Sequence, residues 1–216
     1  MQDKKTYLFD FDGTLVDSMQ GWADFIFDHL NRLNIKYPDD IIKIVSPLGT
    51  RGAAKYLIEL GVNATVDELL ELMDSFALDE YTYRVPAKAY VVDKLTELKN
   101  AGYSLNILTA CNHNLLDPCL KRLGIYDLFD NIWSCEEDLA MSKRAVELYT
   151  LVSQKLDTVC GNCVFFDDNI GALFTAKQAG MITVGVYDAT SEEYIDEIKS
   201  ITDNYVYDFA EINTNI

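Results

Sequence analysis

The chain has 216 residues, a length that suits one domain or a domain with a sizeable insertion. Its hydrophobic content of 49% is that of a folded protein and excludes wholesale disorder. The formal charge of −17 argues against a nucleic-acid partner, because phosphate backbones are bound by clusters of lysine and arginine. A small phosphorylated ligand is still compatible with this charge, since a few local cations can hold it.

No apolar stretch approaches the length of a membrane span, and no apolar signal-peptide region follows Met1–Lys5. We therefore expect a cytoplasmic protein without a membrane partner; nothing in the sequence specifies an oligomeric state. The five cysteines, an odd number, are expected to be free thiols. Cys160 and Cys163 form a Cys-x-x-Cys pair, but a redox pair would begin a helix and this one precedes a predicted strand. A structural role is favoured, and a functional one is left open.

Strand-like apolar runs alternate with helical patterns along most of the chain. The predicted strands are Thr6–Phe11, Ser104–Ala110, Asn131–Cys135, Val164–Asp167, Met181–Tyr187 and Asn204–Tyr207. Glycines end the predicted helices Ala87–Ala101, Asn114–Leu123 and Ala172–Ala179. This alternation predicts an α/β fold, a Rossmann-like parallel sheet covered by helices on both faces.

One segment, residues 17–84, is helical throughout and interrupts the alternation. Helical spacing of apolar residues predicts helices over Asp17–Leu33 and Gly52–Leu60. A capping-box pattern at Thr65–Glu68 predicts the start of a third helix that runs towards Tyr83. The predicted domains are therefore an α/β core of residues 1–16 and 85–216, and a helical domain of residues 17–84.

Polar side chains lie at or just beyond the carboxyl ends of the predicted strands. Asp10 and Asp12 close the first strand and point to one side of it, because alternate strand residues share a face. Thr109 closes the second strand, Lys143 lies after the third at the start of a predicted helix, and Asp167 with Asp168 closes the fourth. The carboxyl ends of parallel strands meet at one edge, where such sheets bind ligands. Carboxylate oxygens suit Mg²⁺, and the ammonium group would offset negative charge.

These residues resemble the motifs of the haloacid dehalogenase (HAD) superfamily. The run Asp10-Phe11-Asp12-Gly13-Thr14-Leu15 is similar to its Asp-x-Asp-Gly-Thr signature. Thr109, Lys143 and the pair Asp167-Asp168 are similar to its second, third and fourth motifs. The helical segment 17–84 resembles the cap domain that follows the first motif in phosphoglycolate phosphatase and β-phosphoglucomutase.

The resemblance implies a role for each of these residues. Asp10 would be the nucleophile and a Mg²⁺ ligand, and Asp12 would be the acid/base that also ligates the metal through its backbone carbonyl. Thr109 and Lys143 would hold the phosphoryl oxygens, helped by backbone N–H groups near Thr109. Asp168 would be a direct metal ligand, and Asp167 would support it through water or Lys143.

The residues that would bind the rest of the substrate are less specified by sequence. Arg51 resembles positions where caps of this family present a cation, and Gly13 and Ala110 are the other candidates for substrate binding. His113 follows Thr109 closely, so that a structural role and a place at the pocket mouth are both open.

The resemblance implies a Mg²⁺-dependent phosphatase that hydrolyses a small phosphorylated metabolite through an aspartyl-phosphate. The substrate would be a sugar phosphate, phosphoglycolate or a nucleotide. One alternative is a phosphomutase of the β-phosphoglucomutase type, and a less favoured one is a non-catalytic phosphate-binding protein. Dehalogenases of the superfamily lack the second aspartate of the first motif, so Asp12 disfavours carbon–halogen cleavage.

Overall fold

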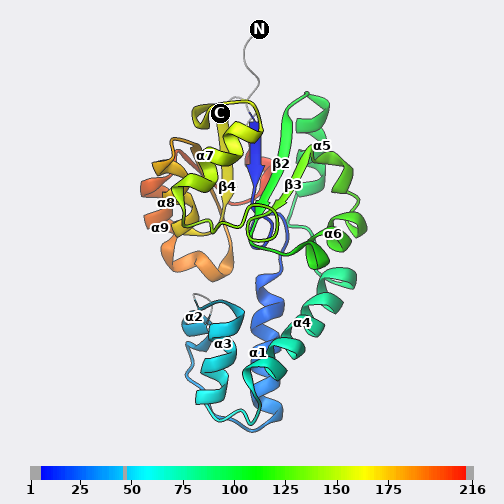
Figure 1. The fold of residues 1–216 in the computed structure, drawn as a ribbon, viewed down its shortest axis with the longest axis vertical. Coiled ribbons are helices and arrows are strands. Elements are labelled where there is room, and N and C mark those ends of the chain that lie inside the picture. Colours follow the sequence, from blue (N-terminus) through cyan, green and yellow to red (C-terminus); the bar gives the residue numbers. More distant parts are fainter. Residues whose placement is uncertain (1–5, 46–47, 213–216) are drawn as a thin grey trace. The chain divides into compact units, whose positions relative to one another are not determined.

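The computed structural model describes residues 6–45 and 48–212 and divides them into two compact units (Figure 1). The core unit contains the described residues up to Asp17 and from Pro86 onward, and the cap unit is Ser18–Val85. The core unit is built on a six-stranded sheet in the order β3-β2-β1-β4-β5-β6. Its strands are β1 (Thr6–Phe9), β2 (Ser104–Thr109), β3 (Asn131–Ser134), β4 (Cys163–Asp167), β5 (Ile182–Val186) and β6 (Asn204–Val206).

All neighbouring strands are parallel, and β1 lies at the centre between β2 and β4. The chain adds β2 and β3 on one side of β1 and then returns to add β4, β5 and β6 on the other. In sheets of this kind, ligands bind beyond the carboxyl ends of the strands where the strand order reverses. That point lies between β1 and β4, and the predicted Rossmann-like α/β fold is confirmed.

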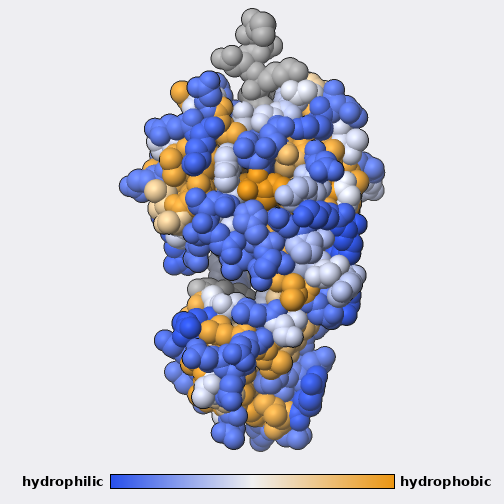
Figure 2. Space-filling model, turned by 45° about the vertical axis from the view of Figure 1, so that its right-hand side comes forward, coloured by the Kyte–Doolittle hydropathy of each residue, from blue (hydrophilic) through white to orange (hydrophobic). Residues whose placement is uncertain are grey.

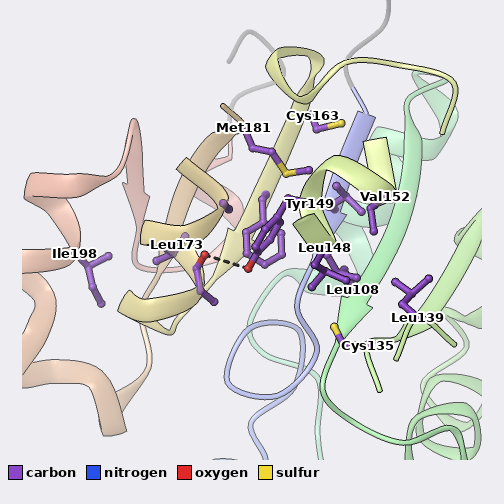
Figure 3. Close-up of a cluster of buried hydrophobic side chains, with 14 residues drawn as sticks. Leu108, Cys135, Leu139, Leu148, Tyr149, Val152, Cys163, Leu173, Met181 and Ile198 are labelled. Atoms are coloured by element: carbon purple, nitrogen blue, oxygen red, sulfur yellow. Dashed lines mark hydrogen bonds between the residues drawn. The ribbon is translucent and has the colours of Figure 1, made fainter. Parts of the chain in front are cut away.

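The alternation of side chains along the strands builds a core on each face of the sheet. On one face, Leu8, Leu108 and Phe165 pack with side chains of helices α7 (Val146–Lys155), α8 (Ile170–Gln178) and α9 (Ile195–Ile201) (Figure 3). On the other, Tyr7, Phe9 and Phe166 stack, with 4.7 Å between the ring centroids of Phe9 and Phe166. Both faces are thereby sealed from water, which explains why the strands read as continuous apolar runs.

The core helices are α5 (Val91–Asn100), α6 (His113–Arg122), α7 (Val146–Lys155), α8 (Ile170–Gln178) and α9 (Ile195–Ile201). Short 3₁₀ segments are η2 (Tyr126–Leu128), η3 (Cys160–Asn162), η4 (Ala189–Tyr194) and η5 (Phe209–Glu211). Within the described part of the chain, no helix is both long and apolar enough to cross a membrane. In Figure 2, hydrophilic residues cover much of the visible face of the core unit.

The cap unit is a bundle of α1 (Met19–Arg32), α2 (Ile41–Val45), α3 (Gly49–Glu59) and α4 (Val66–Tyr83). It has its own core, in which buried side chains such as Leu30, Ile41 and Leu57 pack together. The predicted capping box is present: Glu68 N donates to Thr65 Oγ1 (3.2 Å), and Thr65 N donates to Glu68 Oε2 (2.7 Å). The short helix α2 was not predicted, because five residues are too few to establish a helical period.

The helix expected from Gly52 begins earlier, at Gly49. Two other helices begin later than predicted. The helix expected from Ala87 begins at Val91, because Ala87 bridges to Val16 and Lys88 N donates to Leu15 O (3.0 Å). The helix expected at Lys143 begins at Val146, after a turn in which Ala145 N donates to Ser142 O (2.9 Å). In both cases the backbone hydrogen bonds of the first residues are made outside a helix. The predicted strands agree with those observed, with ends that differ by one or two residues.

Candidate active site

The loop that follows β1 carries both aspartates of the Asp-x-Asp pair. Asp10 N donates to Phe166 O (2.9 Å), so the residue is still held at the edge of β4, and it is buried. The loop is closed tightly, because the amides of Leu15 and Val16 both donate to Phe11 O (2.9 and 3.1 Å). This fixed backbone positions the carboxylates at the switch point of the sheet.

Gly13 is required by its surroundings as well as by its backbone. It has φ +73°, a conformation that glycine adopts without strain. A Cβ atom at this position would lie 2.7 Å from the carboxylate carbon of Asp168. Any other residue would therefore displace Asp168, so that Gly13 acts by leaving room for a carboxylate.

Lys143 ties two of the acidic groups together. Its Nζ pairs with Asp10 Oδ1 and lies 2.8 Å from Asp167 Oδ2, and its side chain is 14% exposed. Burial lowers the pKa of Lys143, but Asp10 and Asp167 outweigh burial and hold it well above its usual value. The ammonium group is thus permanently charged and placed against the predicted nucleophile.

Asp167 and Asp168 end β4 and differ in their partners. Asp167 accepts from Asn169 N (2.7 Å) as well as from Lys143, and burial raises its pKa to about 7 against the opposing effect of Lys143. Asp168 accepts from Thr14 Oγ1 (3.3 Å), and burial with the charges of Asp167 and Asp10 raises its pKa well above its usual value. Such an arrangement of carboxylates is costly unless a cation joins it.

The described residues offer one group of carboxylates that could hold a metal ion. Single oxygens of Asp10, Asp167 and Asp168 all lie within 4.8 Å of one another. All three are hard oxygen donors, which suit Mg²⁺. The set therefore fits a divalent cation, and it includes Asp167, to which the sequence assigned a supporting role.

The second motif lies at the end of β2, beside β1. Thr109 is buried, and its Oγ1 accepts from Cys111 N (3.1 Å), so the loop through Ala110 curls back over the strand end. Burial, followed by the charges of Asp12 and Asp10, raises the pKa of the Cys111 thiol well above its usual value. The negative charges of Asp10 and Asp12 therefore act on this loop, and Cys111 stays a neutral thiol.

Arg51, the candidate from the cap, has a different environment. It lies in α3 of the cap unit, and its side chain is 63% exposed. Its Nη2 is 3.6 Å from Asp67 Oδ1, which is itself 84% exposed. Arg51 is therefore solvated and loosely paired.

Sequence reasoning missed two groups that support the site. Tyr149 in α7 donates from Oη to the carbonyls of Lys143 (3.0 Å) and Ala172 (3.1 Å), the latter drawn in Figure 3. Nothing in the sequence signals this, because Tyr149 is one apolar position among several on its helix. Lys88 Nζ pairs with Asp188 Oδ2 (2.8 Å), and both side chains are mostly buried. Asp188 follows β5, so the strand-end argument could have found it.

The cysteines show no feature of a redox or metal site. All five are free, as expected. Burial raises the pKa of Cys163 to about 12, and Cys160 donates to Ser153 Oγ (3.4 Å). A raised pKa disfavours the reactive thiolate, which supports the structural role that the sequence favoured.

Known proteins share both the sequence pattern and the fold. A phosphoglycolate phosphatase from Colwellia psychrerythraea is 32% identical over 197 residues, which cover 86% of this chain and 85% of that protein. Pyrophosphatase PpaX from Bacillus velezensis is 28% identical over 194 residues, with 86% and 85% covered. The structure of the HAD-hydrolase YfnB from Bacillus subtilis, bound to magnesium, has a TM-score of 0.76 at 18% identity and covers 96% of both chains. Residues 7–186 match the haloacid dehalogenase-like hydrolase family, and the chain is therefore a member of that family and an enzyme of the hydrolase class.

Proposed function

We propose that the protein is a Mg²⁺-dependent phosphatase that hydrolyses a phosphate monoester of a small metabolite through an aspartyl-phosphate on Asp10. The observation that carries the proposal is the ion cluster in which Lys143 pairs with Asp10 and Asp167 beside Asp168. It unites a nucleophile, a cation for phosphoryl oxygens and donors for a metal. The phosphatases among its relatives support the same reaction class.

Asp10 and Asp168, with the backbone carbonyl of Asp12, would hold the magnesium ion, and Asp167 is a further donor near them. The bound ion would neutralise negative charge that otherwise repels an anionic substrate from an anionic nucleophile. Lys143 and Asp167 would stay paired, which orients the ammonium group towards Asp10.

In the first step, an oxygen of Asp10 would form a bond to phosphorus as the bond from phosphorus to the ester oxygen breaks. Asp12, protonated at this stage, would give its proton to the leaving oxygen. Thr109 Oγ1, the N–H of Ala110 and Lys143 Nζ would hold the phosphoryl oxygens, where they stabilise the transition state more than the substrate.

In the second step, water would attack the phosphorus of the aspartyl-phosphate, and Asp12 would take the proton of that water. The phosphorus–oxygen bond to Asp10 then breaks, and inorganic phosphate leaves with both enzyme groups restored. The cap unit would select the substrate, with Arg51 as the candidate cation for a second anionic group and Gly13 and Ala110 as backbone contacts. The substrate would be a small phosphorylated metabolite, and the enzyme would act in the cytoplasm.

The test is phosphate release from a panel of sugar phosphates, nucleotides and phosphoglycolate, with Mg²⁺ and with a chelator. We expect phosphate release when Mg²⁺ is present and none with the chelator. We expect Asp10→Asn to abolish this release while its melting temperature stays within a few degrees of that of the parent protein. Asp127→Asn, which alters an exposed carboxylate in the same unit, is the matched control and should keep full activity. Full activity of the Asp10→Asn variant would contradict the mechanism, and an isomerised hexose phosphate without free phosphate would favour a mutase.

A further inference from the structure

His113 occupies an unusual position between three acidic side chains. Its Nδ1 lies 2.9 Å from Asp117 Oδ1, one turn further along α6. Its Nε2 lies 2.8 Å from Asp138 Oδ2, and its backbone N donates to Glu137 Oε2 (2.8 Å). Both ring nitrogens face a carboxylate, and only the protonated imidazolium can donate a hydrogen bond from each.

Two of these contacts join segments that carry site residues. His113 begins α6, four residues after Thr109, whereas Glu137 and Asp138 lie in the loop between β3 and α7 that leads to Lys143. Asp138 Oδ2 also accepts from Ser134 N (2.8 Å), so this carboxylate is anchored at the end of β3. The backbone adds a further contact, since Cys135 N donates to Thr109 O (2.7 Å).

We infer that His113 is a positioning residue whose imidazolium holds the Thr109 loop to the Lys143 loop by joining Asp117 to Asp138. This inference rests on the proposed function, because it assigns Thr109 and Lys143 to the binding of the phosphoryl group. The neutral imidazole donates from one nitrogen and turns a lone pair towards the other carboxylate. Loss of the proton therefore breaks one of the two contacts and loosens the junction.

The electrostatics of the junction agree with its geometry. The hydrogen bond to Asp117, opposed by partial burial and reinforced by Asp138, raises the pKa of His113. Partial burial raises the pKa of Asp138, but the hydrogen bond from His113, the amide of Ser134 and the charge of Lys155 together hold it below its usual value. Because the pKa of His113 is raised, the ring is protonated and makes both contacts at the ordinary histidine value of about 6.5, and one of the two contacts is lost as pH rises through the raised value. Towards acid, the junction is lost as pH falls through the lowered pKa of Asp138.

The two carboxylates provide a matched pair of variants. Asp117 and Asp138 contact the ring at nearly the same distance, but only Asp138 belongs to the other segment. Asp117→Asn changes a partner of the ring within α6, whereas Asp138→Asn changes the partner through which the ring contacts the other loop. A general electrostatic effect on His113 would make the two variants equivalent, and a junction that positions the loops would not.

The experiment combines NMR titration of the imidazole signals with kcat/KM for p-nitrophenyl phosphate from about pH 5.5 to pH 9. The chain has two histidines, so the imidazole signal that disappears in His113→Gln belongs to His113 and the signal that remains belongs to His29. We expect His113 to titrate above its ordinary value in the parent, and lower in both aspartate variants. The ratio of parent to His113→Gln activity cancels titrations that both share. This activity ratio should be roughly tenfold at low pH, as loss of one charge-assisted hydrogen bond implies, and should fall as His113 loses its proton.

We expect Asp138→Asn to match the activity loss of His113→Gln, and Asp117→Asn to keep most of the parent activity. Equal losses in the two aspartate variants, a constant ratio across the pH range, or a His113 titration at or below its ordinary value would each overturn the inference. A parent enzyme that is inactive on every phosphate ester would overturn the proposed function instead. In that case, the NMR midpoints and the melting temperatures of the same variants, measured against pH, still test the junction.

Discussion

The charged residues that are candidates for substrate binding are mostly buried in the core unit and exposed in the cap unit. In the core unit, Lys143 is 14% exposed and touches two buried carboxylates, and Lys88 forms a second enclosed pair with Asp188. In the cap unit, Arg51 and Asp67 are mostly exposed and 3.6 Å apart. Ion pairs withdrawn from water are strong and fixed in position, whereas exposed ones contribute about 0–1 kcal/mol.

This difference separates two tasks. Phosphoryl transfer needs groups held in one geometry, because stabilisation of the transition state depends on dipoles and charges that do not reorganise. Substrate selection tolerates a solvated side chain that becomes ordered when ligand binds. Under the proposed function, the core unit would carry out the first task, and the exposed surroundings of Arg51 in the cap unit suit the second.

The largest expected effect comes from removing the charge in each unit with the same substitution. Lys143→Met should lower kcat/KM by about 10³-fold, since it removes a donor to the phosphoryl oxygens and leaves Asp10 without its cation. Arg51→Met should raise KM several-fold and leave kcat nearly unchanged, with a free energy of unfolding within about 0.5 kcal/mol of the parent. Steady-state kinetics and denaturant titration measure both.

Lys121→Met is a control for the loss of a lysine on the surface of the core unit, and both constants should stay at the parent values. The contrast between the units fails if Arg51→Met lowers kcat as much as Lys143→Met does. It also fails if Lys143→Met is fully active.

The sequence predicts the core unit well because several independent signals coincide there. Buried parallel strands are read from continuous apolar runs, and side chains after the strand ends must meet at one edge. The positions of Asp10, Thr109 and Asp168 follow from those two facts, whereas Lys143 lies in the loop between β3 and α7, and the roles of all four residues stay predictions. What escapes prediction depends on tertiary contact alone. Tyr149 reaches the Lys143 carbonyl across elements, and His113 meets Asp138 only because β2 and β3 are neighbours.

The cap unit illustrates a second limit of prediction. Its helices follow from spacing and from the Thr65 capping box, but the short helix α2 does not. A helical bundle needs only apolar positions of about the right size, so its core residues are interchangeable in a way that metal donors are not. The sequence therefore specifies that the cap folds and says little about what it binds.

The two units differ in their charged groups, but their apolar cores should be equally sensitive to the loss of a buried side chain. Leu57 in the cap and Leu173 in the core are both fully buried in apolar clusters. Each Leu→Ala substitution should lower the free energy of unfolding by about 2–5 kcal/mol, through lost burial and the cavity that remains. Urea denaturation followed by circular dichroism measures the change. Leu78→Ala, at an exposed position of α4, is the control and should cost far less. A small loss at Leu57 alone would show that the cap core is loosely packed.

The smallest expected effect concerns the start of α4. Thr65→Ala removes the side chain that accepts from Glu68 N, and such a change costs about 1 kcal/mol. Hydrogen bonds from the backbone and then the side chain of Thr65 lower the pKa of Glu68. A carboxylate whose pKa is lowered by folding stabilises the folded state at any pH above its pKa in the unfolded chain. This stabilisation is lost as pH falls through the lower pKa of the folded state. Thr65 Oγ1 also donates to Glu68 Oε2 (2.9 Å), so the melting temperatures of parent and variant should differ most at about pH 7, and the difference should shrink towards about pH 3. A difference that does not change over this range would mean that the Thr65 hydroxyl stabilises the cap only by accepting from Glu68 N, and that its own hydrogen bond to the Glu68 carboxylate contributes nothing.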